Sequence, residues 1–509
     1  MSKVWSPYQQ GVFDHIADPA AGNAIVKAVA GSGKSTTIVE ACRRIPAGKT
    51  SILLAFNKNI ATELQQRGVN AKTFHSLCFG PVLRHKQVNN VETNKLRMLC
   101  KDNMASNDAF IYTMFCTKLV GLARNAGIGC LAADTDDVWW QLADHHNLEV
   151  ENERGNTTRG IELARKLLKW SNESNLVDFD DMLYIAVKDG IALPKFDYVF
   201  VDEAQDTNAI QRAIVRKICH ADSRVVFVGD PAQAIYGFRG ADSESMEMLR
   251  KEFDCTELPL TTSYRCATSI IAVAQRHVPY IEAAEGAPEG EVLVANFSKV
   301  IQATVNAAKG EDAGDTAYQH AFQASDMVVC RTTKPLVELA FKLVRQQVPV
   351  RIMGRDIGNG LKTLVNKMRA SDLDDLTVKI EAWAKREIDK AIAKQMDEKA
   401  EGVQDKMDCI LCLVDGLYET NRTIEALLGG IDFLFDEDRQ ALTLSTIHKA
   451  KGLEADRVWW LNASGCPARW AKQDWQKKQE IHLCYVAITR AKTTLLYIED
   501  GSVKQRRPE

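Results

Sequence analysis

The segment AVAGSGKST at residues 28–36 contains the residue types that bind a phosphate chain. Gly31, Gly33, Lys34 and Ser35 match the phosphate-contacting part of the pattern GxxxxGK(S/T). In such a turn, backbone N–H groups surround the phosphates, the lysine reaches the β- and γ-phosphate oxygens, and the serine hydroxyl binds Mg²⁺. The segment therefore predicts nucleotide binding.

A second set of residues, DYVFVDEAQDT at 197–207, could supply the metal ligand and the base. An apolar run at 198–201 is typical of a buried parallel strand, and adjacent carboxylates follow it. Asp202 could hold Mg²⁺, and Glu203 could polarise the attacking water. An ordinary acidic loop is the alternative, but the phosphate-binding segment favours the catalytic interpretation.

A third set follows another apolar run, in VVFVGDPAQAIYGFRGA at 225–241. Gln233 could sense the γ-phosphate. Tyr236 and Phe238, beside Arg239, suit stacking on single-stranded nucleic acid, where each base contributes about 1 to 3 kcal/mol. Packing in the core is the alternative for either ring.

Hydrophobic patterning predicts the elements that position these residues. The apolar run before the glycine-rich segment indicates a strand, and the spacing from Ser35 onward indicates a helix. Each of the three polar sets therefore follows a strand. In a parallel α/β sheet the carboxyl ends of the strands form the binding edge, so we expect the three sets to meet there.

Seven further segments add to these three sets: WSPYQ at 5–9, AFNKNIATEL at 55–64, KTFHSLC at 72–78, VDFDDML at 177–183, LTTSYRC at 260–266, LTLSTIHKAKGLEADRV at 442–458 and EIHLCYVAITRAK at 480–492. Their order is that of the motifs of superfamily-one DNA helicases, and over nearly its whole length the chain resembles the UvrD/Rep/PcrA type of that family. The sequences AFNKNIA and TFHSL are most similar to those of the F-box DNA helicase branch.

The resemblance implies a set of nucleotide-contacting residues. Gln9 would read adenine, Tyr264 would stack on it, and Arg265 and Arg490 would be arginine fingers, which contribute about 10³ to 10⁵ in rate in P-loop enzymes. The predicted catalytic residues are Lys34, Asp202, Glu203, Gln233, Arg265 and Arg490, and the predicted metal ligands are Ser35 and Asp202. The predicted nucleotide-binding residues are Gln9, Ala30, Gly31, Ser32, Gly33, Lys34, Ser35, Thr36, Tyr264, Arg265, Glu454 and Arg490.

The resemblance also implies contacts with DNA. Phe56 would stack on a base, and Thr73 and His75 stand at DNA-facing positions of the family. Thr446 and His448 lie on the segment that links ribose and DNA contacts. The predicted nucleic-acid-binding residues are Phe56, Thr73, His75, Tyr236, Phe238, Arg239, Thr446 and His448.

The predicted fold class is α/β, with two RecA-like P-loop domains in tandem, each interrupted by a mainly helical accessory insertion. Residues 1–80 and 173–268 would form the first RecA-like domain, and 269–355 with 440–509 the second. The insertions would be 81–172 and a small one at 356–439, both with apolar residues at helical spacing. The small size of the second insertion bears on whether the chain engages duplex DNA.

The function implied is ATP-dependent translocation along single-stranded DNA, 3′ to 5′, with unwinding at duplex junctions, and with ATP and Mg²⁺ as cofactors. The pathways implied by the family are replication, repair and recombination. One alternative is a helicase-fold DNA-binding ATPase subunit that acts as a switch for a partner protein, such as a nuclease, with little unwinding. Another is a P-loop ATPase that acts on protein.

The composition of the chain only slightly narrows the choice between these functions. The chain has 64 basic and 67 acidic residues, a net charge of −3, so any DNA track must be local and its binding sensitive to salt. Its 13 cysteines show no disulfide-framework spacing, which favours a reducing cytoplasm. The CxxC of Cys409 and Cys412 is flanked by apolar residues, which favours helix packing over zinc. No apolar run is long enough to span a membrane.

Overall fold

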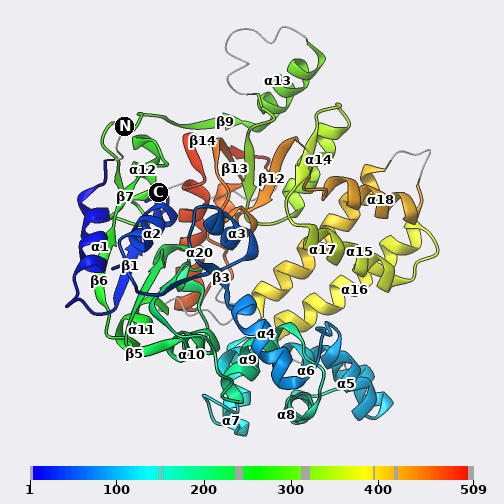
Figure 1. The fold of residues 1–509 in the computed structure, drawn as a ribbon. Helices are drawn as coiled ribbons and strands as arrows, with labels where there is room; N and C mark the ends of the chain where they lie inside the picture. Colours follow the sequence, from blue (N-terminus) through cyan, green and yellow to red (C-terminus); the bar gives the residue numbers. More distant parts are fainter. Residues whose placement is uncertain are drawn as a thin grey trace. The chain divides into compact units, whose positions relative to one another are not determined.

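The structure is a computed structural model and describes residues 4–146, 148, 150, 152, 154–235, 245–310, 321–393, 396–417, 422–438 and 440–501. The chain divides into two units (Figure 1). The first contains Met1–Val29 and Gly33–Thr261, and the second contains Ala30–Ser32 and Thr262–Glu509. Each is built on a parallel six-stranded sheet. The predicted α/β fold class is confirmed, and the two sheets are consistent with tandem RecA-like domains.

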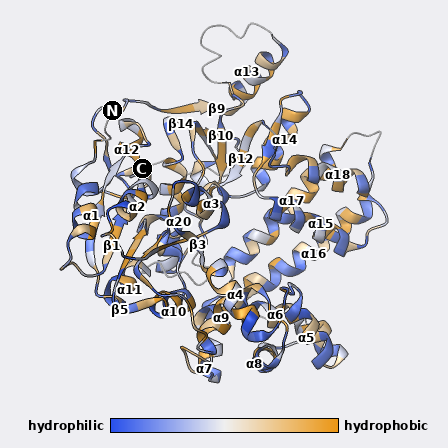
Figure 2. Ribbon diagram, in the orientation of Figure 1, coloured by the Kyte–Doolittle hydropathy of each residue, from blue (hydrophilic) through white to orange (hydrophobic). Residues whose placement is uncertain are grey.

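The first sheet has the strand order β3-β2-β4-β5-β1-β6. Its strands are β1 (Ala24–Ala28), β2 (Ser51–Ala55), β3 (Ala71–Thr73), β4 (Phe196–Val201), β5 (Cys219–Gly229) and β6 (Thr256–Leu260). All pairs are parallel, with Leu53 opposite Phe200 and Ile25 opposite Phe227. Because both faces of a parallel sheet are covered, the buried positions of the central strands are apolar, as in β1, β2 and the second half of β5, and Figure 2 shows orange along β1. Their carboxyl ends share one edge of the sheet.

Helices flank this sheet, and several begin at a side-chain cap. They are α1 (Pro7–Ala17), α2 (Lys34–Arg43), α3 (Lys58–Gln66), α4 (Phe74–Lys86), α9 (Phe179–Lys188), α10 (Ala209–Lys217) and α11 (Ser245–Glu252). Ser6, Thr73 and Asp178 each form a capping box, which fixes where α1, α4 and α9 start.

Four further helices lie between α4 and α9 in the chain: α5 (Lys95–Asn103), α6 (Ser106–Ala126), α7 (Asp136–His145) and α8 (Thr157–Glu173). They fall within the predicted helical insertion. Their buried residues, such as Phe115 and Trp139, belong to the same apolar cluster as Ile52 of the sheet. The exact limits of the insertion therefore stay a prediction.

Buried charges join this helical layer to α9. Lys95 Nζ lies 2.5 Å from Asp181 Oδ2, and Arg124 Nη1 lies 2.8 Å from Asp178 Oδ2. Arg124 Nη2 also pairs with Asp181 Oδ1 at 2.9 Å. Since Lys95 and Asp181 are fully buried, loss of one partner would leave an uncompensated charge.

The second sheet has the order β11-β12-β10-β13-β14-β9, again with parallel pairs. Its strands are β9 (Glu291–Asn296), β10 (Met327–Cys330), β11 (Val350–Ile352), β12 (Leu442–Thr446), β13 (Ala455–Leu461) and β14 (Ala491–Glu499), with β7 (Thr262–Ser263) and β8 (Glu282–Ala283) as a separate pair. The helices around it are α12 (Thr268–Ala274), α13 (Phe297–Lys309), α14 (Lys334–Val344), α19 (Ile447–Ala450) and α20 (Asp474–Ile488).

The remaining helices, α15 (Arg355–Met368), α16 (Leu373–Ala393), α17 (Asp397–Gly416) and α18 (Ile424–Leu434), fall within the predicted second insertion. Acidic residues on α17 bind the start of α14. Asp405 accepts the N–H groups of Thr333 and Lys334, and Asp408 lies 3.0 Å from Lys334 Nζ. This helical layer is therefore held to its own unit by directed polar contacts.

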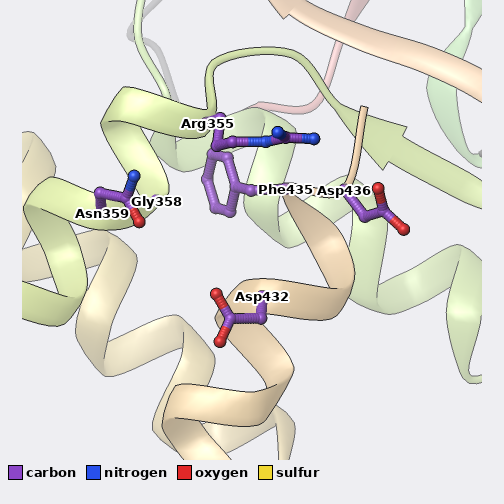
Figure 3. A pocket seen from close by; sticks show the side chains of 6 residues that line it. All are labelled: Arg355, Gly358, Asn359, Asp432, Phe435 and Asp436. Atoms are coloured by element: carbon purple, nitrogen blue, oxygen red, sulfur yellow. The ribbon is translucent and has the colours of Figure 1, made fainter. Parts of the chain in front are cut away.

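Two other features of this layer bear on predicted sites. Cys409 is buried in α17 and Cys412 is partly buried, and both pack against apolar neighbours as free cysteines. Figure 3 shows a pocket between α15 and α18, lined by Arg355, Gly358, Asn359, Asp432, Phe435 and Asp436. None of the predicted nucleotide or nucleic-acid residues that the structure describes lines it. Across the described ranges, no helix has both the length and the apolar character needed to cross a bilayer.

Candidate nucleotide and nucleic-acid sites

The phosphate-binding segment connects β1 to α2. Gly33, just before α2, has φ 76°, a left-handed conformation in which other residues would be strained. The N-cap residue of α2 is Gly33, which has no side chain to cap the first turn, and that turn contains the partly buried Ser35 and Thr36. The N–H groups of that turn can therefore bind an anion, and the helix dipole favours one.

Ala30–Ser32 belong to the second unit, and their contacts within it explain why residue 31 is a glycine. The Ala30 N–H donates to the Tyr485 hydroxyl at 2.8 Å, and the Gly31 carbonyl accepts the Tyr264 N–H at 2.8 Å. Gly31 has φ 74°, and a Cβ there would lie 2.5 Å from Arg265 Cβ. Both the backbone and the available space therefore require glycine. Ser32 is buried beside it.

The strand order brings Lys34 to the acidic pair. Lys34 Nζ lies 2.8 Å from Glu203 Oε1, and the Glu203 N–H donates to Asp202 Oδ1 at 2.9 Å. Burial lowers the pKa of Lys34, but Glu203, Asp202 and Asp230 together raise it above its ordinary value. Lys34 therefore stays cationic, as phosphate binding requires.

Asp230, at the end of β5, completes this acidic edge. Gln233 Nε2 donates to Asp230 Oδ2 at 2.6 Å, and the Ala232 N–H donates to Oδ1 at 3.0 Å. Burial raises the pKa of Asp230 to about 6, against the opposing effects of Lys34 and of the two donors. Gln233 is buried, with its amide held by this carboxylate.

Gln9 is buried between α1 and α2. Its Nε2 donates to Thr37 Oγ1 at 3.1 Å, and its Oε1 accepts the Ser6 N–H at 3.1 Å. The predicted adenine reader is thus fixed directly to the helix that starts with Lys34.

In the second unit, Arg265 is held by an acidic partner. Arg265 Nε lies 2.7 Å from Glu454 Oε2, and Lys492 Nζ lies 2.9 Å from Glu454 Oε1. Burial raises the pKa of Glu454, but Lys492 and Arg265 outweigh it and lower the pKa. The carboxylate therefore stays ionised and orients the guanidinium. Tyr264, next to Arg265, is half-exposed.

Arg490 is almost fully buried at the end of α20. Its Nε donates to the Val486 carbonyl at 2.9 Å, its Nη1 to the Leu453 carbonyl at 3.0 Å, and its Nη2 to Thr489 Oγ1 at 3.2 Å. Arg265 Nη1 donates to the Thr489 carbonyl at 3.2 Å. The structure therefore brings the two predicted fingers together at Thr489.

The predicted DNA contacts of the first unit follow neighbouring strands. Phe56 comes directly after β2 and is 44% exposed, and Thr73 ends β3, which pairs with β2. Thr73 also caps α4, on which His75 lies. Burial lowers the pKa of His75, which favours its neutral form. Phe56, Thr73 and His75 are thus brought to one edge of the sheet.

In the second unit, Thr446 ends β12 and caps α19, where its Oγ1 accepts the Lys449 N–H at 3.4 Å. Burial lowers the pKa of His448 to about 3, with smaller contributions from Arg331 and Lys449. His448 is therefore neutral. Tyr236, Phe238 and Arg239 lie outside the described residues.

Comparison with known proteins decides the family. Residues 13–254 match the UvrD/REP helicase N-terminal domain, and residues 369–500 match the UvrD-like helicase C-terminal domain. The chain belongs to the UvrD/Rep family of superfamily-one helicases. The resemblance predicted from the motifs is confirmed.

The individual relatives of this UvrD/Rep-family chain have low sequence identity to it. It is 24% identical over 512 residues to F-box DNA helicase 1 of Gallus gallus, covering 92% of this chain and 47% of the relative. It is 27% identical over 296 residues to a probable DNA helicase II homolog of Mycoplasma pneumoniae, covering 52% and 41%. F-box DNA helicase protein 1 of Schizosaccharomyces pombe is 23% identical, covering 92% and 55%. The chain spans about half the length of the curated relatives it matches.

In this family member, two residues near the predicted sites are not indicated by the motifs. Phe179 is 55% exposed, and its ring lies 6.4 Å from that of His75, edge to face. Gln205 is buried beside Glu203. Phe179 lies inside the VDFDDML segment, so an exposed aromatic in a matched motif was the available signal. The contacts of Gln205 depend on strand order, which the sequence does not state.

The residues predicted to hold Mg²⁺ fit its chemistry. Ser35 offers a hydroxyl in the first turn of α2, and Asp202 offers a carboxylate after β4. Mg²⁺ favours hard oxygen ligands and is bound through one or two protein groups with waters and substrate phosphates. Among the residues with described coordinates, no cluster of three or more His, Cys, Asp or Glu forms a self-sufficient metal site.

Proposed function

We propose that this chain hydrolyses ATP to translocate along single-stranded DNA and unwinds duplex DNA in its path. The observation that carries the proposal is the contact of Lys34 with Glu203 at the carboxyl edge of a parallel sheet, beside the uncapped start of α2. A phosphate-binding cation, a metal-binding carboxylate and a base there form the parts needed for phosphoryl transfer.

In this proposal each residue has a separate role. Lys34 leaves Glu203 to bind the β- and γ-phosphates, and Glu203 is then free to orient the attacking water. Ser35 and Asp202 would hold Mg²⁺, which neutralises charge on the phosphates. Gln233, whose amide is held by Asp230, would respond to the γ-phosphate.

Arg265 and Arg490 are proposed to stabilise the charge that develops during hydrolysis. The support is their preorganisation, since Glu454 orients Arg265 and three acceptors fix Arg490. Fixed donors need no reorganisation at the moment of reaction, which is where electrostatic catalysis gains most.

The polymer is proposed to be DNA, read without sequence preference. Phe56 and Phe179 are exposed aromatic rings able to stack on unpaired bases. The relatives' names include DNA helicases, which favours DNA over RNA. Movement from 3′ to 5′ is part of the proposal and comes from the family resemblance alone.

The deciding experiment is the steady-state ATP hydrolysis rate with and without single-stranded DNA, followed by strand displacement on duplexes with 3′ or 5′ tails. We expect strong stimulation, displacement from the 3′-tailed substrate, and loss of both activities in Lys34→Ala. Stimulation without displacement would instead support the switch-like ATPase, which the small helical layer of α15–α18 favours. A rate unchanged by DNA in the wild type would reject both functions.

A further inference from the structure

Gln205 joins the two acidic turns of the nucleotide site through one carboxamide. It lies in the short 3₁₀ turn Ala204–Asp206, directly after Glu203, and is 0% exposed. Its Nε2 donates to Glu203 Oε2, and its Oε1 accepts the Asp230 N–H at 3.1 Å. A single amide therefore bridges the end of β4 to the end of β5.

The surroundings fix this amide in one orientation. A rotation exchanging its oxygen and nitrogen would face its NH₂ toward the Asp230 N–H and its oxygen toward the Glu203 carboxylate, so both contacts would become repulsive. A Cβ at Gly229 would overlap Gln205 Oε1. The Ser245 hydroxyl donates to the Gln205 carbonyl at 2.6 Å, which holds the backbone. The absence of a side chain at Gly229 thus makes room for the bridge.

The bridge acts on a carboxylate whose backbone is itself constrained. Glu203 has φ 48°, the left-handed region that costs a non-glycine residue free energy unless its surroundings hold it there. Its Oε1 contacts Lys34 and its Oε2 accepts from Gln205. When phosphate draws Lys34 away, the Gln205 contact remains on Oε2.

We propose that Gln205 is a positioning residue for hydrolysis. It holds the Glu203 carboxylate in the orientation that activates water and links it to the turn carrying Gln233. The link is continuous, because Gln205 binds the Asp230 N–H and the Asp230 carboxylate binds Gln233. Its catalytic role rests on the proposed function, whereas the bridge itself does not.

Three variants test the proposal. Gln205→Glu keeps an acceptor for the Asp230 N–H but removes the donor to Glu203, and Gln205→Met removes both at similar volume. Gln211→Glu is the matched control, since Gln211 Oε1 only accepts the Asn208 N–H at 2.9 Å in a helix cap, which a carboxylate also does. Each variant is assayed for kcat, KM for ATP and the unfolding midpoint.

We expect Gln205→Glu to lower kcat roughly 10²-fold with little change in KM, the pattern of a lost transition-state interaction. Gln205→Met should lower kcat to a similar extent, because it also lacks the donor to Glu203. Gln211→Glu should behave as wild type.

Wild-type kcat in both Gln205 variants, a rise in KM in place of a fall in kcat, or a loss that Gln211→Glu reproduces would overturn the positioning role. A wild type that hydrolyses no ATP would instead reject the proposed function. The unfolding midpoints then test the bridge alone. Both Gln205 variants should unfold at a lower temperature than Gln211→Glu, and equal midpoints would overturn the bridge.

Discussion

Lys34 Nζ and Glu203 Oε1 lie 2.8 Å apart, so the cation predicted to bind phosphate and the carboxylate predicted to activate water neutralise each other. In the proposed function, binding of ATP exchanges this contact for one between Lys34 and phosphate. The two residues should respond differently to substitution, because only one of them is needed for binding.

We expect Lys34→Ala to abolish hydrolysis and weaken ATP binding. Glu203→Gln should retain ATP binding, since Lys34 then has no competing anion at this contact, while kcat falls about 10²- to 10⁴-fold, as for loss of a general base. Calorimetric titration and steady-state hydrolysis measure the two effects. Lys27→Ala is the control, because Lys27 of β1 pairs with Glu257 of β6 and lies outside the proposed site. Weak ATP binding by Glu203→Gln would contradict the assignment.

Burial raises the pKa of Asp230, so replacing its carboxylate by a neutral side chain should stabilise the protein. The size of this gain should depend on pH. The folded pKa is about 6 against an ordinary value of 3.8, so the folded state binds the proton more tightly. The contribution of Asp230 to stability is thus fully present below about pH 3.8 and is lost as the pH rises through about 6. Asp230→Asn should unfold at a higher temperature than wild type at about pH 8, and the difference should vanish near about pH 4.

Thermal unfolding across this pH range measures the effect. Asp197→Asn is the control. Asp197 is a surface carboxylate whose pKa is lowered by the N–H and hydroxyl of Thr50 and by Lys49. Its substitution should reduce stability at neutral pH, the opposite sign. If the wild type were more stable than Asp230→Asn at about pH 8, burial of the ionised Asp230 carboxylate would not destabilise the folded state.

Much of the site could be predicted because residues that follow parallel strands lie together at the carboxyl edge of the sheet. Lys34, Asp202 and Gln233 each follow an apolar run, and parallel strands bring such positions to one edge of the sheet. The contact of Lys34 with Glu203 follows from that rule together with the motif. The fold class followed from the same repeated pattern of strand, loop and helix.

Other contacts depend on which strands are neighbours, and no local pattern states that. Gln205 reaches the Asp230 N–H because β4 pairs with β5. Arg265 and Arg490 are far apart in sequence, and their shared contact with Thr489 became visible only with the fold. Phe179 stands in a matched motif, yet its exposure beside His75 depends on the packing of α9 against α4.

The buried ion pairs of the helical layer should matter more than exposed ones. Lys95→Met would leave the Asp181 carboxylate buried without its lysine and should lower the free energy of unfolding by about 3 to 5 kcal/mol. Arg159→Met, which removes exposed pairs with Asp108 and Glu162, should cost about 1 kcal/mol or less. Denaturant titration of both variants measures this difference. Equal losses would mean that Arg124 alone compensates Asp181.

Arg490 should separate binding from turnover. Arg490→Ala should retain ATP affinity and lower kcat by about 10³- to 10⁵-fold, as expected for loss of an arginine finger. Because Arg490 is buried and satisfies three acceptors, its removal could also unfold the second unit. Arg490→Lys, compared by circular dichroism and unfolding midpoint, keeps the charge while removing the planar set of donors. A folded Arg490→Lys that lacks turnover, beside a control Arg355→Lys with wild-type kcat at an exposed arginine of the second unit, would assign the loss to the guanidinium. Wild-type turnover in Arg490→Ala would remove Arg490 from the catalytic set.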